Sequence, residues 1–525
     1  MINFLLKILV ITLLISCSQI VELIDSDYHT TFNNDKSLSI LFSHNINGET
    51  HPCGCRNFPL GGLPQAYGVI TDLSKNKNIF YVDSGDTLFS NPHVPDILRK
   101  STKYTAEKLA EALDLLGLKI FTPGDQDFAL GEEFLINVAN KSKFKFLISN
   151  SSENLRIKHE KYIHLKANSV NYFFIGVLSK DLLQQSDRDL FIDSYSAIKK
   201  VLTELKTKHS NLKNKKIILL SHSGLSKDRL IAKKFPQIDW IIGAHSQSYM
   251  RYSEDVGDTQ IVQVLSRNHF IGEINFPTSN NKKTTYKIHE TREETKDLVK
   301  NNSLISWLDS YKSNLDKIQL DEQNELTVDQ DQDNRMATYI SCTNCHTAQT
   351  DFWQGTAHSI AHITLQNAKA ENNTTCIKCH SLGFKKENGF LHTKNIVSSD
   401  KAIDINKYWK DFRANINNIP SIKTMSSKER REISKKWIKL DRKKEISHNF
   451  ANVQCLHCHV QTKEHPFDTS SGALKKNISN TCVECHTQDQ SPEWYLKDSK
   501  GLATSLNKKY FSKKLKEVSC PKIER

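Results

Sequence analysis

The chain has 525 residues, of which 38% are hydrophobic and 25% are charged, and its net charge at pH 7 is +13. With 19 glycines and 12 prolines, this composition excludes a collagen-like or largely disordered protein, and the length is sufficient for two or three globular domains. The positive charge by itself is compatible with nucleic-acid binding.

Residues 1–16 predict an export signal, because the apolar run from Ile8 to Ile15 is too short to span a bilayer. Leu14-Ile15-Ser16-Cys17 resembles the lipobox of bacterial lipoproteins, which implies that Cys17 is diacylated. An ordinary cleaved signal is the alternative. By resemblance, an aspartate directly after the cysteine would favour retention at the inner membrane, but Ser18 stands at this position. We therefore expect an extracytoplasmic, lipid-anchored protein on the periplasmic face of the outer membrane rather than at the inner membrane.

Residues 17–36 are polar and are expected to form a tether. Residues 37–290 alternate short apolar runs with helical periodicity, which predicts an α/β layered domain. The expected strands are 38–42, 79–83, 144–149, 172–177, 217–221, 240–243 and 261–265. The expected helices are 105–116, 194–207 and 226–235.

Polar residues follow apolar runs at five places in this domain, and α/β folds place their sites at strand ends. The five segments are Ser43-His-Asn-Ile-Asn-Gly48, Val82-Asp-Ser-Gly-Asp86, Pro123-Gly-Asp-Gln-Asp127, Leu220-Ser-His-Ser-Gly224 and Ile242-Gly-Ala-His-Ser-Gln247. In this order they resemble the motifs of calcineurin-like metallophosphatases, most of all the 5′-nucleotidase branch. The resemblance implies an α/β metallophosphatase-like layered sandwich over residues 37–290 and a pair of divalent metals that clamp a phosphate and generate hydroxide.

The metal ligands that this resemblance implies are only partly present. Asn45, Asn47 and Gln247 stand where the family has Asp or His ligands to the first metal, and Gln126 replaces its leaving-group histidine. The ligands to the second metal have acceptable counterparts, which are Asp86, Asp125, His222 and His245. Two carboxylates and two imidazoles suit zinc, manganese or iron. We therefore expect a degenerate site with one divalent metal or none, and no two-metal hydrolysis.

A Cys-Gly-Cys sequence, Cys53 to Cys55, follows the first polar segment. Together with Gly61-Gly62-Leu63 it resembles a signature of metallophosphatase-like domains associated with multihaem cytochromes. The two thiols could replace lost metal ligands, pair as a disulfide, act in redox chemistry or be inert, and the sequence leaves these alternatives open. After this domain we expect a helix over residues 291–320 and an acidic linker over residues 321–336.

The sequence Cys-x-x-Cys-His occurs four times in the remaining part of the chain. In chain order the four motifs are Cys342-Thr-Asn-Cys345-His346, Cys376-Ile-Lys-Cys379-His380, Cys455-Leu-His-Cys458-His459 and Cys482-Val-Glu-Cys485-His486. At this spacing two thiols attach to the vinyl groups of one porphyrin, and the histidine becomes the proximal iron ligand. Zinc ribbons or local disulfides are alternatives, but neither explains the histidine in every motif. We expect four covalently bound haems c, which are attached outside the cytoplasm.

The haems also change the interpretation of the charge. Four haems carry eight propionates, which would reduce the net charge to about +5 before the iron is counted, so we expect no nucleic-acid partner. Residues 401–447 hold fourteen Lys or Arg against six Asp or Glu, and the tail at 496–525 holds nine against three. These segments either form a solvated face that balances propionates or dock an acidic redox partner.

Residues 340–495 resemble the cytochrome c554 family of tetrahaem proteins, which implies a mostly α and irregular multihaem domain over 337–495, with an insertion at 401–447. The segments that carry the resemblance are Trp353-Gln-Gly-Thr-Ala-His-Ser-Ile-Ala361, Val453-Gln-Cys-Leu-His-Cys-His459 with Glu464-His465, and Cys482-Val-Glu-Cys-His-Thr-Gln-Asp-Gln-Ser-Pro492. It implies His358 and His465 as distal haem ligands. His448 and His392 are weaker candidates, with surface positions as the alternative, and His362 could compete with His358.

We therefore expect a membrane-anchored tetrahaem cytochrome that transfers electrons and carries a non-hydrolytic metallophosphatase-like domain. Two alternatives remain open. If one haem lacks a distal ligand, the protein could be a redox enzyme that acts on a small nitrogen or oxygen species. If the N-terminal site is intact, it could be a metal-dependent phosphoesterase or 5′-nucleotidase with an appended cytochrome.

Overall fold

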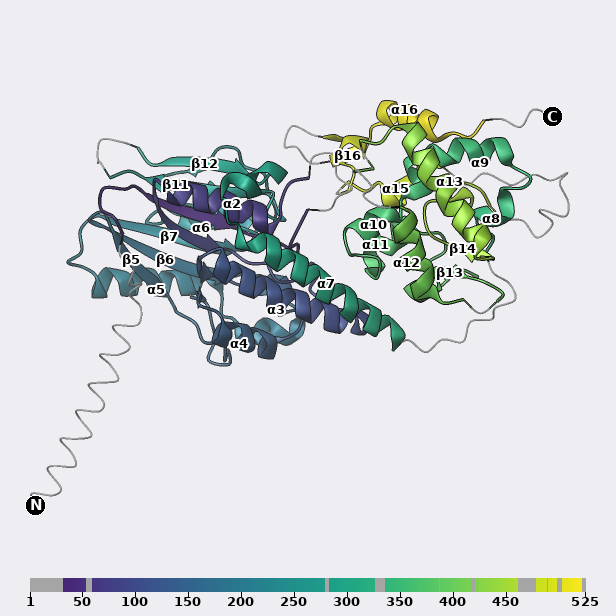
Figure 1. Cartoon of the computed structure of the whole chain (residues 1–525). Helices are drawn as coiled ribbons and strands as arrows, with labels where there is room; N and C mark the ends of the chain where they lie inside the picture. The colour runs from purple at the N-terminus through teal and green to yellow at the C-terminus, as the bar shows by residue number, and fades with distance from the viewer. Residues whose placement is uncertain are drawn as a thin grey trace, which may run out of the picture. The chain divides into compact units, whose positions relative to one another are not determined.

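The computed structural model describes residues 32–52, 59–278, 283–325, 336–386, 388–401, 403–416, 421–422, 424–460, 478–488, 490–497 and 503–521. The described residues form two compact units, one up to Leu308 and the other from Asp309 (Figure 1). The expected export signal with Cys17, the Cys53–Cys55 pair and His465 lie outside the described residues. None of the described helices is both long enough and apolar enough to cross a membrane.

The first unit contains two six-stranded sheets. The first has the order β12-β11-β1-β2-β3-β4, with β1 Leu38–Ser43, β2 Asn78–Asp83, β3 Leu118–Phe121, β4 Lys145–Phe146, β11 Phe270–Phe276 and β12 Thr285–Glu290. The second has the order β5-β6-β7-β8-β10-β9, with β5 Ile163–Ala167, β6 Val170–Leu178, β7 Lys215–His222, β8 Trp240–Gly243, β9 Glu254–Val256 and β10 Thr259–Val262. In the first sheet β1, β2, β3 and β4 are parallel, and β11 and β12 extend it with antiparallel pairing. In the second sheet β6, β7, β8 and β10 are parallel, and the edge strands β5 and β9 are antiparallel to them.

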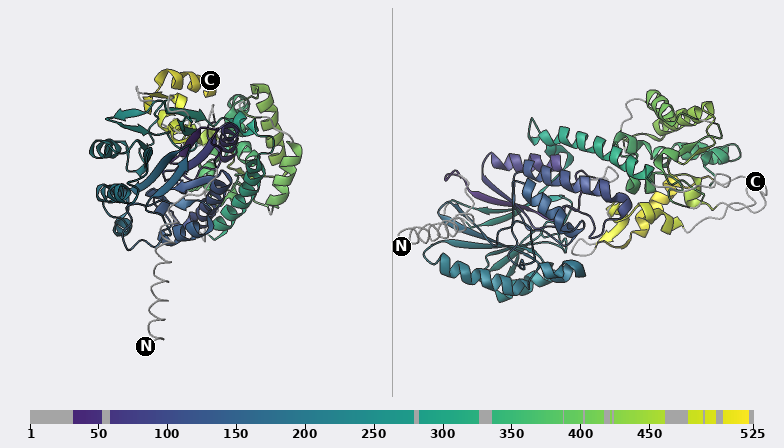
Figure 2. Two further views of the ribbon diagram at one scale, coloured as in Figure 1. Left: turned by 90° about the vertical axis from the view of Figure 1, so that its left-hand side faces the viewer. Right: turned by 90° about the horizontal axis from the view of Figure 1, so that it is seen from below.

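Helices cover the outer faces of both sheets, and Figure 2 shows the strands lying between them. The helices on the first sheet are α2 Leu63–Ser74, α3 Arg99–Leu115 and α4 Glu132–Lys141, and those on the second are α5 Ser194–Lys208 and α6 Leu225–Lys234. Side chains alternate along β1, so Ile40 packs between the two sheets while Leu41 packs against the helices. The predicted α/β layered sandwich is confirmed.

Several elements differ from the sequence prediction. β4 covers only Lys145–Phe146 of the expected strand at 144–149, and β3, β5, β9, β11 and β12 were not predicted. The expected helix over 291–320 is interrupted, because a 3-10 turn covers Glu293–Leu298 and α7 runs from Ser303 to Asn324. Of these, β3 matters most for function, since the chain leaves it directly into the third polar segment.

A buried carboxylate in β11 links neighbouring strands of the first sheet and should make the fold sensitive to acid. Glu273 accepts hydrogen bonds from Ser39 Oγ at 2.5 Å, Lys77 Nζ at 2.5 Å and His289 Nε2 at 2.8 Å. Burial opposes ionisation, but the three donors lower the pKa of Glu273 from 4.5 to about 2. Its stabilising contribution is therefore present above pH 4.5 and is lost as the pH falls towards 2.

We predict that Glu273→Gln lowers the melting temperature at pH 7. Between about pH 4.5 and 2, the melting temperature of the variant should decrease less with falling pH than that of the wild type. Thermal denaturation of the full chain across this range, followed in the first unit by far-UV circular dichroism, measures the effect. Equal pH dependence in the variant and the wild type would contradict the assignment.

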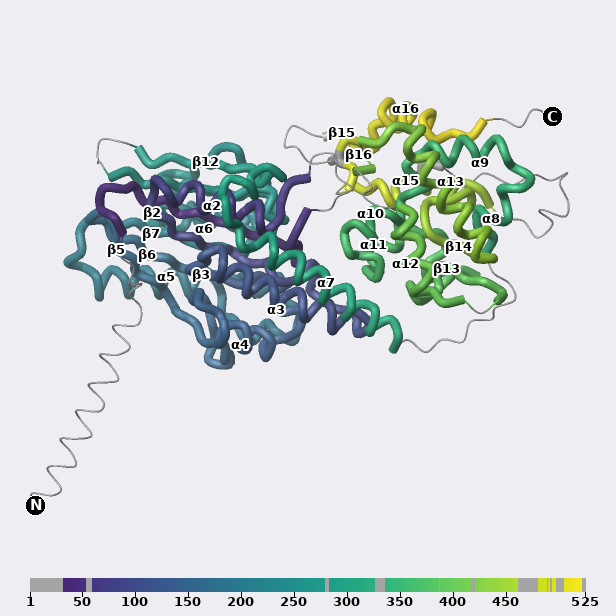
Figure 3. The backbone as a smooth tube through the Cα atoms, viewed as in Figure 1, coloured from purple at the N-terminus to yellow at the C-terminus, as the bar shows by residue number. Residues whose placement is uncertain are grey.

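The second unit is built from short helices, which the tube in Figure 3 follows. They are α8 Tyr339–Cys342, α9 Thr347–Gln354, α10 Ile363–Asn367, α11 Thr374–His380, α12 Ile405–Asn415, α13 Ser427–Lys443, α14 Cys455–Cys458, α15 Ile478–Cys485 and α16 Lys508–Val518. Two short antiparallel pairs accompany them, β13 Val397–Ser398 with β14 His448–Asn449 and β15 Tyr495–Lys497 with β16 Ala503–Leu506. This helical character confirms the fold class that the sequence predicts here.

The basic insertion contributes to the core of the second unit as well as to its surface. Tyr408 and Phe412 on α12 and Trp437 and Leu440 on α13 are buried in the apolar cluster of this unit. The opposite face of α13 is exposed and basic. α12 and α13 therefore form part of the folded unit rather than a surface appendage.

Candidate functional site

Four side chains of the first unit meet at the carboxyl ends of its parallel strands. Asp86 follows β2, Asp125 follows β3, His222 ends β7 and His245 follows β8. One ligand atom from each lies within 4.8 Å of the others. The side chains of Asp86 and His222 are fully buried, whereas those of Asp125 and His245 are 10% and 36% exposed. The structure thus brings together the four residues that the sequence predicts for a single metal.

The donor atoms of this cluster are arranged as they would be around a divalent cation. His222 Nε2 lies 3.2 Å from Asp86 Oδ2 and 3.2 Å from Asp125 Oδ1, and His245 Nδ1 lies 3.1 Å from Asp125 Oδ1. His222 Nδ1 donates to the Ser84 carbonyl oxygen at 2.7 Å, which leaves Nε2 for a metal. The residues therefore fit one divalent metal.

The charges in the cluster compensate one another in the absence of a cation. Although burial opposes it, the charge of Asp86 and hydrogen bonding to Asp125 hold the pKa of His222 well above its usual value. Burial also opposes the shift at Asp125, but hydrogen bonds with His222 and His245 lower the pKa of this carboxyl. A divalent cation would take the place of the proton on His222.

Amide groups fill the position where the family would place its first metal. Asn45 Nδ2 and Gln126 Nε2 donate to Asp86 Oδ2 at 3.0 and 2.9 Å, and the Gln126 backbone N–H donates to Asp86 Oδ1 at 2.9 Å. Asn45 Oδ1 is also occupied, since it accepts from the His245 backbone N–H at 3.0 Å. N–H donors thus contact both oxygens of Asp86, and Oδ2 is the same oxygen that faces His222 Nε2.

The loops that carry these residues keep strained backbone conformations. Five residues of these loops that are not glycine have positive φ angles, namely Asn45 (50°), Asn47 (57°), Asp86 (55°), His245 (67°) and Gln247 (49°). Such conformations cluster at functional sites because the surrounding structure must enforce them. A Cβ atom on Gly124 would lie 2.3 Å from Asp86 Oδ1 and 2.5 Å from His222 Cε1, so only glycine allows this close approach.

Asp127 positions the loop after β2, a role that the sequence did not predict. This buried carboxylate accepts the backbone N–H groups of Asp86, Thr87, Leu88 and Gly124 at 2.8 to 3.0 Å. Burial and the charge of Asp86 raise the pKa of Asp127 to about 7. Its place two residues after Asp125 is the only sequence signal for this role.

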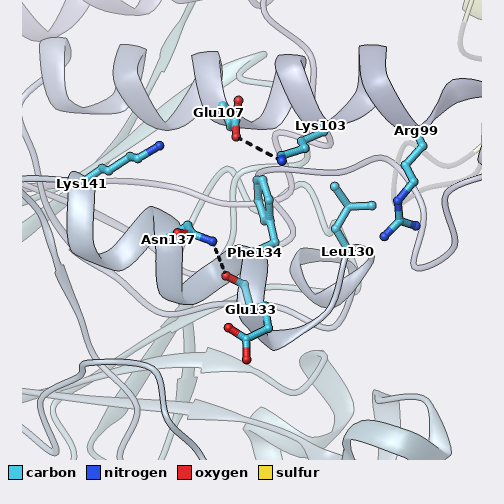
Figure 4. A pocket seen from close by; sticks show the side chains of 8 residues that line it. All are labelled: Arg99, Lys103, Glu107, Leu130, Glu133, Phe134, Asn137 and Lys141. Atoms are coloured by element: carbon cyan, nitrogen blue, oxygen red, sulfur yellow. Dashed lines mark hydrogen bonds and ion pairs between the residues drawn. The ribbon is translucent and has the colours of Figure 1, made fainter. Parts of the chain in front are cut away.

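A surface pocket of about 340 Å³ lies between α3 and α4 of the first unit (Figure 4). Its lining residues are Arg99, Lys103, Glu107, Leu130, Glu133, Phe134, Asn137 and Lys141. Some of the charged side chains around the pocket form ion pairs with each other, since Lys103 Nζ lies 4.0 Å from Glu107 Oε1. No residue of the metal cluster lines this pocket.

The histidines of two haem motifs are oriented as proximal ligands would be. His380 Nδ1 lies 2.7 Å from the Ala361 carbonyl oxygen and 3.0 Å from Thr364 Oγ1. His486 Nδ1 lies 2.9 Å from Ser491 Oγ, and its ring stacks on Trp494 with centroids 4.1 Å apart. In both histidines Nδ1 is thus held by a hydrogen bond, as is usual for histidine that binds a metal through its other nitrogen. These residues fit the haem that the motif implies.

The four motifs lie next to one another in an order that differs from their order in the chain. A hydrogen bond with Cys455 lowers the pKa of Cys342, which places the first motif against the third. A hydrogen bond with Cys379 raises the pKa of Cys485, which places the second motif against the fourth. Burial and the nearby Cys458 raise the pKa of Cys482 to about 11, so the third motif neighbours the fourth. The spatial series is therefore first, third, fourth, second.

The candidate distal ligands occupy different environments. Burial lowers the pKa of His358, and the nearby His380 lowers it further. The pKa of His486 is lowered to about 4, mainly by burial and also by the nearby His358. His358 thus lies near the proximal histidines of the second and fourth motifs. His392 is buried with no partner for Nδ1 among the described residues, and His448 stacks on Phe450 at 6.0 Å.

His362 and His457 are placed by contacts within the second unit. His362 is buried beside Trp409 and Trp437, with ring centroids 5.5 and 6.4 Å away. His457 Nδ1 accepts the Gln454 backbone N–H at 3.0 Å. The distal ligand assignments remain predictions.

Comparisons with known proteins match both parts of the chain. Residues 341–402 match the family described as cytochrome c554 and c-prime. The chain is 27% identical to the 5′-nucleotidase of Mus musculus over 209 residues, which is 37% of this chain and 34% of that protein. It is 25% identical to the 5′-nucleotidase of Homo sapiens over 202 residues, which is 36% of this chain and 33% of that protein. The chain thus spans about a third of the length of these curated relatives.

Among solved structures, the chain resembles a 5′-nucleotidase precursor from Thermus thermophilus with a TM-score of 0.44 and 17% sequence identity, covering 53% of this chain and 59% of that chain. The predicted resemblances to cytochrome c554 and to 5′-nucleotidases are confirmed, the former over residues 341–402 and the latter in the N-terminal part. The chain therefore joins an N-terminal part that is similar to 5′-nucleotidases to a later segment that matches the cytochrome c554 family.

Proposed function

We propose that this protein transfers electrons through four covalently bound haems. The observation that carries the proposal is the spatial series of the motifs, in which thiols of neighbouring motifs lie against one another. These thiols and the histidines that follow them would hold the haems, and the closeness of neighbouring motifs would let electrons pass along the series. The haem supplies one-electron chemistry, and the protein contributes ligands, burial and spacing.

The proposal predicts that the irons are low-spin, because bis-histidine ligation closes them to substrates. Low-temperature electron paramagnetic resonance of the oxidised full chain measures this directly. A high-spin ferric signal that shifts when nitrite or hydroxylamine is added would support the alternative, a redox enzyme with one open haem.

We also propose an extracytoplasmic location with a lipid anchor at Cys17, since haem attachment takes place outside the cytoplasm and the leader has a lipobox pattern. Stable attachment needs more than one acyl chain, which a diacylated cysteine with a further acyl group would supply. Mass spectrometry of the N-terminal peptide from isolated outer membranes should find a lipidated Cys17. An unmodified mature N-terminus in the soluble periplasmic fraction would contradict the anchor.

We propose that an acidic redox partner docks on the exposed basic face of α13. Lys436, Lys439, Arg442 and Lys443 are exposed on this helix, and complementary charge accelerates encounter. The reduction rate by an acidic donor such as a flavodoxin should fall with ionic strength, and Lys436→Glu with Lys439→Glu should slow it about tenfold at low salt. A rate independent of both changes would exclude this surface.

For the first unit we propose a single divalent metal without phosphoesterase activity. The cluster around Asp86 supports the metal, and the amide donors of Asn45 and Gln126 argue against the second one that phosphate hydrolysis needs. The similarity to 5′-nucleotidases supports hydrolysis as the second candidate function.

We predict that the purified protein with Mn²⁺ does not release phosphate from a nucleoside monophosphate. Phosphate release is measured against the same preparation treated with a chelator. Metal-dependent hydrolysis that is lost in His222→Ala would favour the phosphoesterase instead.

A further inference from the structure

The basic insertion carries a carboxylate into the interior of the second unit. Asp441 on α13 is 2% exposed. It accepts hydrogen bonds from Tyr408 Oη at 2.5 Å, from Asn449 Nδ2 at 2.9 Å and from Tyr339 Oη. All three partners are neutral, and no cation contributes to the environment of this carboxyl among the described residues. A buried carboxylate without a cation is costly in its charged form, so its presence calls for an explanation.

The hydrogen bonds around Asp441 connect it to two haem motifs. Tyr339 begins α8, the helix that ends at Cys342 of the first motif. The Tyr339 backbone N–H donates to Gln454 Oε1 at 2.7 Å, and Gln454 directly precedes Cys455 of the third motif. Gln454 Nε2 in turn donates to the Asn449 carbonyl oxygen at 2.7 Å. Asp441 therefore lies at the junction of the first and third motifs.

We propose that Asp441 is a proton-binding site coupled to the reduction of the haem attached at Cys342 and Cys345. The proposal rests on the proposed electron-transfer function. When that haem takes one electron from the redox partner, its iron goes from the ferric to the ferrous state, and the carboxylate of Asp441 takes one proton from solvent. On oxidation the electron leaves to the next acceptor and the proton returns to solvent. No bond to the haem forms or breaks.

The physical basis is charge compensation in a medium of low dielectric constant. An added electron near a buried carboxylate is opposed by a negative charge that water does not screen, and protonation removes this opposition. Burial raises the pKa of Asp441 to about 6. The carboxyl group should therefore change its protonation state between pH 5 and pH 8, the range of the test below. Proton binding and reduction of that haem should therefore favour each other.

The groups that face Asp441 do not titrate in the same range. Tyr339 on α8 and Tyr408 on α12 have pKa values well above the usual value for tyrosine, because of burial and the charge of Asp441. From α13 itself, Trp437 Nε1 donates to Tyr408 Oη at 2.8 Å. The ion pair between Lys444 and Asp411, at 2.5 Å, is partly exposed and takes no part in these hydrogen bonds.

The test is a spectroelectrochemical titration of the haem-loaded full chain between pH 5 and pH 8. In the wild type, the midpoint potential of one haem should fall with rising pH, with an uptake approaching one proton per electron. Asp441→Asn keeps the size of the side chain and should abolish this dependence for that haem alone. Asp411→Asn, an exposed change on the neighbouring helix, is the matched control and should leave the dependence as in the wild type.

A second variant keeps the test informative if Asp441→Asn does not fold. Tyr408→Phe removes a donor to the carboxylate, so the pH dependence should move to higher pH. An unchanged pH dependence in Tyr408→Phe, or in a folded Asp441→Asn that retains all its haems, overturns the proposal while electron transfer stands. A wild-type protein without haem would instead overturn the proposed function itself.

Discussion

Replacing both Cys482 and Cys485 with alanine should reduce the haem content from four to three per chain and unfold the segment from Ile478 onwards. The described part of that segment supplies one buried hydrophobic residue, Trp494, whose ring stacks on the motif histidine His486. The apolar cluster of the second unit comes instead from residues 360–451. Under the proposed function, a haem held at the fourth motif would supply most of the apolar contacts around α15 and α16.

The size of this effect follows from the volume that the porphyrin would leave behind. Losing a buried leucine side chain costs about 3–5 kcal/mol, and a missing porphyrin leaves a much larger space. We expect a loss of more than about 5 kcal/mol in unfolding free energy, which is comparable to the whole stability of a domain.

Haem absorbance per chain and limited proteolysis after residue 478 measure these two consequences. Val483→Ala with Glu484→Ala changes the two residues between the cysteines and serves as the matched control, with four haems and wild-type resistance expected. A double cysteine variant that keeps four haems, or that is as resistant as the control, would contradict the role of the fourth motif.

Replacing His222 with alanine should abolish metal binding by the first unit. His222 is the fully buried member of the cluster whose Nε2 faces both Asp86 and Asp125 at 3.2 Å. Changes at residues that only support a ligand already cost 10- to 100-fold in metal affinity, so loss of this ligand should cost at least about 100-fold. Asp86 would also be left without an imidazole partner, whereas Asp125 would keep His245.

Metal analysis of the purified chain after equilibration with Zn²⁺, Mn²⁺ or Fe²⁺ measures the outcome, with haem iron subtracted from the iron count. His93→Ala removes an exposed histidine of the same unit and should retain one metal per chain. Equal metal content in both variants would show that the cluster is not the binding site.

The layered fold was predictable where strands contain long apolar runs, as in β6 and β7. β11 was missed because glycine and glutamate interrupt its pattern at Gly272 and Glu273. Both have structural reasons, since a Cβ on Gly272 would lie 2.2 Å from the ring of Phe42 and Glu273 is held by three hydrogen-bond donors. β3 is four residues long, too short for periodicity to reveal.

The metal cluster was predictable because its four residues stand at motif positions of the family that the sequence resembles. Three of them, Asp86, His222 and His245, also come directly after predicted strands, where α/β folds place their sites. The amide network on Asp86 was only half predictable. Its residues were identified as substitutions, but the direction in which Asn45 and Gln126 point depends on the folded loops.

The surroundings of Asp441 could not be predicted from sequence. Its partners come from α8, α12 and β14, which are far apart in the chain, and the composition of α13 favours an exposed basic helix. Periodicity alone does not distinguish an aspartate on the buried face of such a helix from one at its surface.

The central claim is that haem is bound covalently at four places. A pyridine haemochrome assay on protein purified from the periplasm or its membranes, combined with the mass of the denatured chain, tests this most directly. We predict four haems c per chain that remain attached after extraction with acidified organic solvent. A colourless chain that holds zinc and has no added haem mass would contradict the account.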